Sequence, residues 1–275
     1  MTTSVTHLWR LLKWGRTLAR HGALRGIERD PLTPKPVRRL ARIARFGARI
    51  PPSPQYADAL VAIGPAAVKL GQALSTRPDL VGQEAAENLS QLQDDLPPAP
   101  FHLIRQSIER SFHAPLESLF SKFDEEPVGA ASIAQVHHAI TTEGREVAVK
   151  VLRPGIEDEF AKAIETYEWA AAQVEGYGEE IQRLRPRAVV AQFRQWTARE
   201  LDLQREAASA SELKENMVAE PGYYVPEIDW RRTARRVLTL EWLDGIKLSD
   251  RERLIAAGQD CETLAKTLVR AFLRQ

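Results

Sequence analysis

The stretch EEPVGAASIAQVHHAITTEGREVAVKVLRPG, Glu125–Gly155, decides the fold. Its second half carries short apolar runs typical of β-strands, and the turn sequence Thr-Thr-Glu-Gly joins the last two of them. We therefore predict an antiparallel hairpin with strands at 134–140 and 146–152, preceded by a loop of small residues. Lys150 lies in the middle of the apolar run VAVKV, where a buried ammonium group is costly unless a carboxylate pairs with it.

The small residues before the hairpin follow the spacing of a nucleotide-binding loop. Gly129, Ala131 and Ala134 stand where the glycine-rich loop of a protein kinase, G-x-G-x-x-G-x-V, has its three glycines. Val136 stands at the valine of that pattern, and Lys150 follows it by 14 residues. Kinases place the strand lysine that holds the α- and β-phosphates at a similar separation. Loop, hairpin and lysine together indicate a kinase-like nucleotide-binding lobe.

The rest of the sequence predicts an α+β protein in which strands cluster around one long helix. Further β-like runs fall at 123–127, 223–230 and 235–245, and helical runs at 7–29, 56–78, 84–96, 101–112, 156–182, 187–217 and from 249. Four parts follow from this order: a basic amphipathic N-terminal segment, 1–50; a helical extension, 51–115; a kinase-like nucleotide-binding lobe, 116–240; and a hinge with the first helices of a second lobe, 241–275.

A buried Lys150 needs a carboxylate, and the helix predicted at 187–217 offers candidates. At 100° per residue its apolar residues form one stripe, and Glu200 lies inside that stripe. Asp202 and Glu206 are i, i+4 neighbours on the flank. The stripe consists of Val189, Phe193, Trp196, Leu203 and Ala207. A carboxylate within an apolar face is expected to be paired, whereas the alternative, a solvated charge run, explains the neighbouring arginines but not Glu200.

Cysteine content and hydropathy bound the compartment. A single cysteine, Cys261, excludes an internal disulfide and a cysteine cluster for zinc, which favours a reducing cytoplasmic compartment. No apolar run approaches the roughly 18 residues that cross a bilayer, and the start has no apolar signal-peptide core. The sequence therefore predicts a cytoplasmic chain without a transmembrane segment.

The N-terminal segment is strongly cationic. Between residues 10 and 49, Glu28 and Asp30 face twelve basic residues: Arg10, Lys13, Arg16, Arg20, Arg25, Arg29, Lys35, Arg38, Arg39, Arg42, Arg45 and Arg49. The helix at 7–29 fits two interpretations. It lies on an anionic membrane surface, peripheral at the inner face with Trp9 and Trp14 at headgroup level, or it packs on its own domain with a solvated basic face. Nucleic acid is a weaker third alternative, because no known reader motif accompanies the charge.

Six stretches between about residues 60 and 245 carry a family resemblance: KLGQALSTRPDL, LSQLQDDLPPAPF, VGAASIAQVHHA, VAVKVLRPGI, ELDLQREA and LTLEWLDG. In this order they resemble the UbiB family of atypical protein-kinase-like proteins, which is associated with ubiquinone (coenzyme Q) biosynthesis. The K-x-G-Q and E-x-D elements are specific to that family. The resemblance implies an atypical protein-kinase-like fold with a helical extension, a small β lobe and a C-terminal lobe, and we expect this chain to be a truncated copy with that last lobe incomplete.

The resemblance implies roles in the helical extension. Lys69, Gly71 and Gln72 match the K-x-G-Q signature, in which the extension folds over the active site. Glu200 and Asp202 match the E-x-D element. The resemblance implies that Glu200 pairs with Lys69.

It also implies roles in the nucleotide site. Glu206 matches the helix glutamate that pairs with Lys150, and the remaining residues surround the nucleotide. They are Ala130, Ala131 and Ser132 of the alanine-rich loop, Gly129, Ala134 and Val136 of the same loop region, and Glu241 and Leu243 at the hinge beside the adenine. Alanine in place of glycine restricts the loop, so nucleotide handling should differ from that of an ordinary kinase.

The implied activity is that of an ATPase or small-molecule kinase that binds ATP or ADP. Phosphoryl transfer by the kinase route requires an aspartate with an asparagine five residues later, and a D-F-G aspartate that holds Mg²⁺. After Glu241 the chain has only Asp244, Asp250 and Asp260 and no asparagine, so Mg²⁺ is expected only with the rest of the second lobe. Two functions stay open: part of a UbiB-type enzyme, or a non-catalytic membrane-peripheral module that holds nucleotide, isoprenoid lipid or ubiquinone-biosynthesis proteins.

Overall fold

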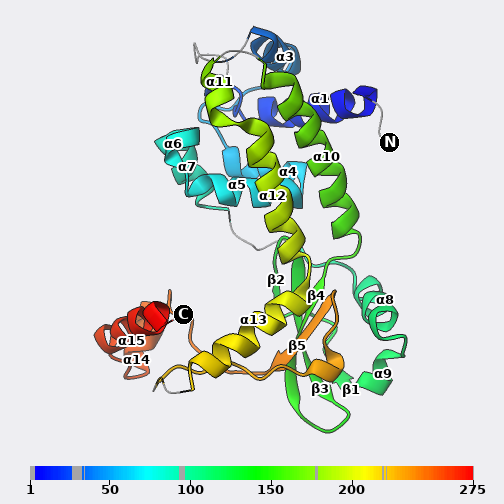
Figure 1. Ribbon diagram of the computed structural model, residues 1–275, viewed down its shortest axis with the longest axis vertical. Coiled ribbons are helices and arrows are strands. Elements are labelled where there is room, and N and C mark those ends of the chain that lie inside the picture. Colours follow the sequence, from blue (N-terminus) through cyan, green and yellow to red (C-terminus); the bar gives the residue numbers. More distant parts are fainter. Residues whose placement is uncertain are drawn as a thin grey trace. The chain divides into compact units, whose positions relative to one another are not determined.

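The computed structural model describes residues 4–26, 33, 35–92, 97–176, 179–218, 220 and 222–274 (Figure 1). The chain divides into two compact units. The first, here called the helical unit, contains residues 1–96, 131–133 and 155–199. The second, the β unit, contains residues 97–130, 134–154 and 200–275.

The helical unit is built from helices that pack through small and aliphatic side chains. Its helices are α1 (Ser4–Arg20), α3 (Lys35–Arg45), α4 (Tyr56–Ile63), α5 (Pro65–Ser75), α6 (Pro78–Val81), α7 (Gln83–Leu89), α10 (Ile156–Val174), α11 (Glu179–Leu184) and α12 (Pro186–Glu200). One core cluster joins α5 to α7 through Val68, Leu89 and Leu92. α10 packs along α5 as well as α1, so the two halves of this unit meet although they are distant in sequence.

The single helix predicted at 56–78 is wrong, because the chain breaks between α4 and α5. Gly64 has φ +133°, a conformation that side chains with a Cβ rarely adopt, and Pro65 disfavours helical geometry in the residue before it. Pro65 then opens α5 at its first position, where its missing N–H costs nothing. The predicted helix at 84–96 is shorter in the structure, where α7 ends at Leu89.

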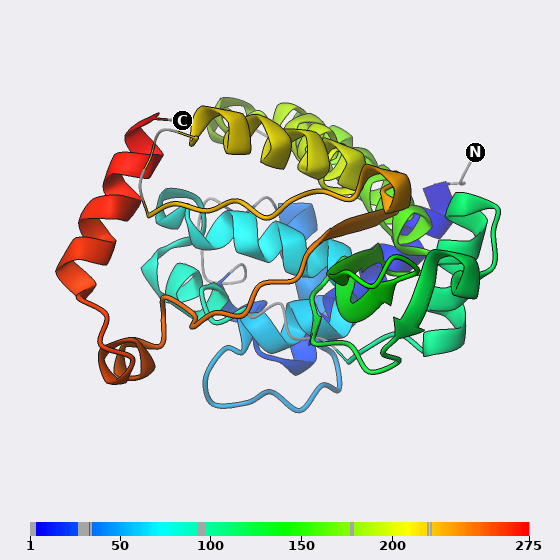
Figure 2. The same ribbon diagram turned by 90° about the horizontal axis from the view of Figure 1, so that it is seen from below.

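The β unit holds one antiparallel sheet in the order β1-β3-β4-β5, with β2 paired to β3. Its strands are β1 (Phe120–Phe123), β2 (Gly129–Ala130), β3 (Ala134–Thr141), β4 (Glu146–Leu152) and β5 (Val237–Glu241). Figures 1 and 2 show β3 and β4 side by side, with β5 next to them. The predicted hairpin is confirmed, and Gly144 has φ +83° in its turn.

Two other strand predictions are wrong. The run predicted at 123–127 lies earlier, because β1 begins at Phe120 and ends at Phe123. The run predicted at 223–230 forms only an isolated bridge from Ile228 to Leu240, followed by the 3-10 helix η1 (Trp230–Arg232). Asp229 caps η1 by accepting a hydrogen bond from the amide of Arg231 at 3.2 Å, which turns the chain away from the sheet.

One face of the sheet carries the core of the β unit. Val147, Val149 and Val151 of β4 alternate onto this face and are buried with Ile104 and Ile108. Those isoleucines lie on α8 (Phe101–Phe112), which is followed by the short helix α9 (Leu116–Leu119). Because side chains on a strand alternate between faces, Ala148 and Lys150 point to the opposite face. The core therefore determines which face presents the lysine.

The long helix predicted at 187–217 is two helices. α12 ends at Glu200, and α13 (Leu203–Asn216) begins after Asp202, whose carboxylate accepts a hydrogen bond from the amide of Gln204 at 3.2 Å. Asp202 is thus an N-cap, outside the helical flank where the sequence placed it. The apolar stripe across both segments is wrong for the same reason, and Val189 in it is 45% exposed.

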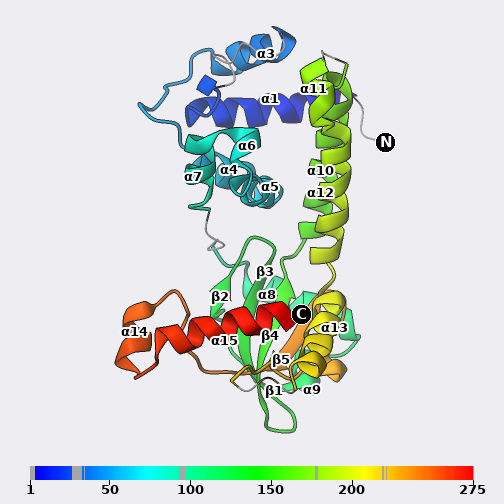
Figure 3. The same cartoon turned by 60° about the vertical axis from the view of Figure 1, so that its left-hand side comes forward.

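The last part of the β unit is helical, as predicted from residue 249. It contains α14 (Arg251–Ala256) and α15 (Cys261–Arg274), both visible in Figure 3. Glu220, whose side chain is 1% exposed, forms ion pairs with Arg270 and Arg274 of α15. These pairs attach α15 to the segment that follows α13.

Candidate functional site

Lys150 and Glu206 form the centre of the candidate site. Lys150 projects from the middle of β4, and its Nζ donates hydrogen bonds to both carboxylate oxygens of Glu206 at 2.8 Å each. Glu206 lies in the first turn of α13. The two side chains are 27% and 48% exposed, so their ion pair adds little to folding stability. It fixes the direction of the ammonium group, and the pairing predicted from the sequence is present.

A row of paired residues crosses the sheet at Lys150. Gly129 pairs with Val136, Val136 with Lys150, and Lys150 with Leu238. The 14-residue separation between Val136 and Lys150 has a simple cause: the hairpin turns around Glu143, seven residues from each, and brings them directly opposite. The kinase-like spacing in the sequence therefore corresponds to cross-strand neighbours.

The face that carries Lys150 is apolar and partly open. Val136, Ala148 and Leu240 share this face and are half-buried. Ala148 was not predicted as a site residue, although its position two residues before Lys150 on one strand was a sufficient signal. The sheet thus places an apolar strip beside one ammonium group.

A histidine and a tryptophan extend this face. His138 pairs with Ala148 across the hairpin, and its Nδ1 lies 2.9 Å from a carboxylate oxygen of Asp124. Hydrogen bonds from Lys122 and His138 lower the pKa of Asp124 below its ordinary value. The ring of Trp242 meets the His138 ring edge-on, with 4.7 Å between ring centroids. Neither His138 nor Trp242 was predicted as a site residue.

The alanine-rich loop requires no glycine. Gly129 in β2 does not have a positive φ, and a Cβ added to it would meet no atom within 4 Å. Ala130 continues β2, and Ala134, 1% exposed, opens β3. Ala131 and Ser132 belong to the helical unit by their contacts, and Ser132 is fully buried. The strand pairing that surrounds the loop tolerates alanine where kinases have glycine.

Of the predicted hinge residues, Glu241 ends β5 and Leu243 follows the strand. The carboxylate of Glu241 accepts hydrogen bonds from the Tyr224 hydroxyl at 2.5 Å and the Glu227 amide at 3.1 Å, and these, led by the bond from Tyr224, lower the pKa of Glu241. The amide of Glu241 donates to the carbonyl of Glu227 at 2.8 Å. Leu243 is 47% exposed.

The K-x-G-Q residues lie on α5 in the helical unit. Lys69 and Gln72 are half-buried, and the Lys69 ammonium lies over the ring of Trp196, 5.6 Å from its centroid. Gly71 is buried, and a Cβ there would overlap the side chains of Leu60 and Leu92. Glycine in this signature therefore serves close packing.

The predicted pair between Lys69 and Glu200 stays a prediction, because the two residues belong to different units. Asp202, the other carboxylate of the E-x-D element, caps α13 and lies 3.6 Å from Arg205. The structure thus gives Asp202 a local structural role at the start of the helix that carries Glu206.

The arrangement of acidic, histidine and cysteine side chains bears on metal binding. Among the described residues, no group of three such side chains is placed to hold a metal ion.

Helix length and hydropathy bear on membrane spanning. In the part of the chain that the structure describes, no helix combines the length and apolarity needed to cross a bilayer.

The fold and the lysine–glutamate pair define a protein of the kinase-like class, and a family comparison agrees. The model of the ABC1 atypical kinase-like domain matches residues 91–275. The chain belongs to this atypical kinase-like family, and the α+β kinase-like fold expected from the sequence is confirmed.

Individual relatives narrow this further. "Probable protein kinase UbiB" of Marinobacter nauticus is 44% identical over 217 residues, which cover 79% of this chain and 40% of the relative. The protein of the same name from Xylella fastidiosa strain M12 is 43% identical and covered to 39%. The UbiB resemblance is confirmed, and the chain spans about two fifths of the length of these relatives.

The solved structures that are similar to this chain include one from Mycobacterium tuberculosis. Its title is "The complex structure of Rv3197-erythromycin from Mycobacterium tuberculosis". It is 28% identical with a TM-score of 0.47, and the match covers 69% of this chain and 47% of that one.

Proposed function

We propose that the β unit binds ATP or ADP at Lys150, as part of an atypical kinase or ATPase that supports ubiquinone biosynthesis. The observation that carries this proposal is the geometry of Lys150. Its ammonium is held by both oxygens of Glu206 on a partly open sheet face, directly opposite Val136. A cation fixed beside an apolar strip suits a ligand with an anionic phosphate end and a flat apolar base.

Each part of the site then has a binding role. Val136, Ala148 and Leu240 contact the base, and the backbone near Leu243 supplies its polar partners. Lys150 donates hydrogen bonds to phosphate oxygens, while Glu206 holds the ammonium group in place and offsets its charge before nucleotide binds. Alanines in the loop restrict its backbone relative to glycine, which narrows the set of phosphate positions that the loop accepts.

For these residues taken by themselves, the proposed activity is binding. The sequence contains neither the aspartate–asparagine pair of a kinase catalytic loop nor D-F-G after Glu241. Phosphoryl transfer or ATP hydrolysis, and Mg²⁺ with it, are proposals for the whole protein. The alternative remains a non-catalytic module at a membrane surface. Isoprenoid lipid, ubiquinone-biosynthesis proteins and an anionic membrane surface at the inner face are the partners proposed beside nucleotide.

Equilibrium binding of a fluorescent ADP analogue to the full chain tests the nucleotide site. Lys150→Met removes a charge-assisted phosphate contact and should weaken binding by about 10-fold to 100-fold. Lys122→Met is the matched control, because Lys122 lies on edge strand β1 of the same sheet and is 60% exposed. The affinity of the Lys122→Met variant for the ADP analogue should stay within about twofold of that of the wild type. Equal affinity of the Lys150 variant and the wild type would place the nucleotide site elsewhere.

A further inference from the structure

The segment around α3 carries charge of one sign. Residues 33–57 contain six basic residues and no acidic one. Four of the basic residues, Lys35, Arg39, Arg42 and Arg49, are exposed. Within the described residues, Lys35, Arg39 and Arg42 have no ion-pair partner. An uncompensated cluster of this kind attracts an anionic surface.

Packing on α1 fixes which side of α3 faces outward. Ala41 and Ala44 are buried in a cluster with Ala19 and Leu24. The approach is close, since a Cβ added to Gly15 of α1 would lie 3.3 Å from the Cβ of Ala44. Figures 1 and 3 show α1 between α3 and α4. One side of α3 therefore belongs to the core of the helical unit, and the other is free of it.

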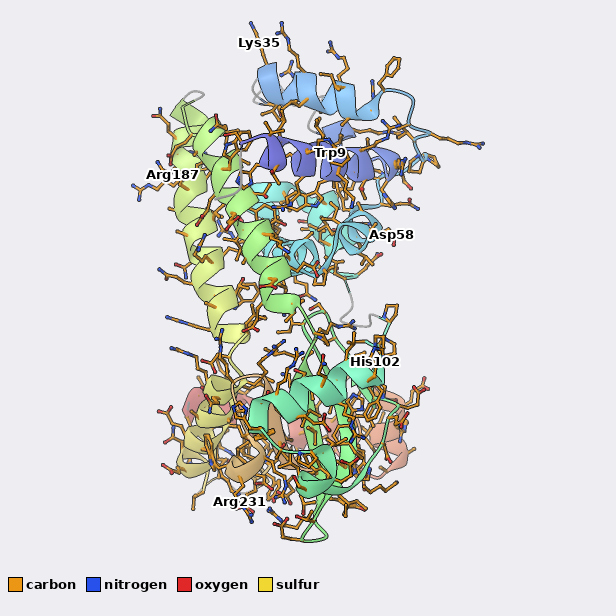
Figure 4. All side chains as sticks on the ribbon, turned by 90° about the vertical axis from the view of Figure 1, so that its right-hand side faces the viewer. Trp9, Lys35, Asp58, His102, Arg187 and Arg231 are labelled. Atoms are coloured by element: carbon orange, nitrogen blue, oxygen red, sulfur yellow. The ribbon has the colours of Figure 1, made fainter. Side chains whose placement is uncertain are left out.

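The outward side of α3 combines cations with large apolar side chains. At 100° per residue, Arg39 and Ile43 of α3 fall opposite Ala41 and Ala44, and Phe46 directly follows the last residue of the helix. Ile43 is 61% exposed and Phe46 is 85% exposed. In Figure 4, Lys35 stands on the side of α3 that faces away from α1. These residues, with Arg42, form what we call the α3 face.

α1 is the helix for which the sequence predicts membrane contact. It makes more packing contacts within the helical unit than the α3 face does. His7 is buried, with its Nδ1 3.1 Å from the Thr166 hydroxyl of α10. Trp14 packs on Tyr167, with 5.3 Å between ring centroids. Trp14 therefore cannot lie at headgroup level without leaving this contact, although Trp9 is 68% exposed. The α3 face has no such competing contacts among the described residues.

We propose that the α3 face lies in the headgroup region of an anionic lipid bilayer, with Ile43 and Phe46 inserted and the cations at the phosphates. Helices that lie in a bilayer interface combine exposed apolar side chains with lysine and arginine in this way. The phosphates of a nucleic acid would pair with the basic side chains but leave Ile43 and Phe46 in water. Charge and apolarity together therefore favour the bilayer. The inference rests on the proposed membrane partner and is independent of the nucleotide site.

Flotation of the full chain with lipid vesicles tests this surface. Vesicles of phosphatidylcholine with about one third phosphatidylglycerol should bind the chain, and pure phosphatidylcholine should bind it much more weakly. Ile43→Ser with Phe46→Ser should reduce the partition coefficient by about 10-fold or more. Arg39→Gln with Arg42→Gln should reduce it by roughly 25-fold at low salt, with a smaller loss at high salt.

Matched controls distinguish vesicle binding by the α3 face from nonspecific binding by other exposed side chains. Val61→Ser removes an apolar side chain that is 44% exposed on α4 of the same unit. Lys247→Gln with Arg251→Gln removes two exposed charges in the β unit. Both controls should bind vesicles as the wild type does, and all variants should keep the wild-type melting temperature and ADP affinity, because the altered side chains are exposed.

Three results would overturn the inference in different ways. Wild-type binding to anionic vesicles that neither α3 variant weakens would move the membrane contact to another surface. No vesicle binding by the wild type would refute the membrane partner itself, while the ADP measurement still stands. Binding that depends on Arg39 and Arg42 but not on Ile43 and Phe46, and that short RNA competes away, would identify a nucleic-acid surface.

Discussion

Replacing Arg232 by methionine should destabilise the β unit more than the same replacement of an exposed arginine. The Arg232 side chain is 3% exposed, and its guanidinium donates hydrogen bonds to four acceptors from three segments of the chain. It donates to Asp229 at 2.8 Å, Glu143 at 2.6 Å, the Thr142 hydroxyl at 3.0 Å and the Leu119 carbonyl at 2.7 Å. These bonds join the hairpin turn and the end of α9 to the segment that precedes β5.

The magnitude follows from what the substitution leaves behind. Asp229 is 4% exposed and would keep only Arg145, 2.7 Å away and 53% exposed, as its ion-pair partner. Removing one partner from a buried ion pair costs about 3–5 kcal/mol, because the other charge stays buried without compensation. Arg232→Met should therefore lower the free energy of unfolding by about this amount.

Urea unfolding followed by tryptophan fluorescence measures this loss. Arg231→Met is a matched control, since the side chain of the neighbouring Arg231 is 78% exposed and pairs with Glu143, while the hydrogen bond from its amide to Asp229 is kept; the substitution should change the free energy of unfolding by less than about 0.5 kcal/mol. Adding Asp229→Leu to Arg232→Met should recover part of the lost stability, because it removes the buried carboxylate that no longer has Arg232 as its partner. Equal effects of Arg231→Met and Arg232→Met would refute the reasoning.

Acid and helix-cap measurements supply the remaining predictions. The pKa of Glu143 is lowered from 4.5 to about 2, first by the hydrogen bond from its own backbone amide and then by Thr141 and Arg232. A depressed pKa in the folded state stabilises the fold above pH 4.5, and this stability is lost as the pH falls toward 2; urea midpoints of Glu143→Gln should therefore change less between pH 5 and pH 3 than those of the wild type. Asp202→Ala should lower the free energy of unfolding by about 1 kcal/mol through loss of the α13 cap, whereas Gln204→Ala should not, because only the amide of Gln204 contacts Asp202.

The hairpin was predictable because its signals are local. Both strands and their turn lie within Glu125–Gly155, and the register follows from the turn position. The sheet face that carries Lys150 could also be predicted from the sequence, since Val147, Val149 and Val151 alternate with it along one strand. By contrast, the strand predicted at 223–230 failed because the Asp229 cap, a side-chain hydrogen bond, competes with strand pairing.

Apolar periodicity could not predict the break between α12 and α13, because the periodicity continues across it. Leu203 and Ala207 keep the helical spacing of Phe193, and both are fully buried, yet they belong to α13, a separate helix that begins after the Asp202 cap. Periodicity reports which side chains are buried and says nothing about whether one axis runs through them. Asp202, a strong N-cap residue type, was the signal that a new helix begins.

This break explains why the E-x-D element and the lysine pair belong together. Because Asp202 starts α13, Glu206 falls in the first turn of the new helix, where its carboxylate reaches Lys150 on β4. Glu200 stands on the other side of the break, at the end of α12. One continuous helix would hold the two glutamates at a fixed angle on one axis, whereas the cap gives each its own direction. Asp202 therefore acts on the Lys150 ammonium group indirectly, by fixing where Glu206 lies in α13.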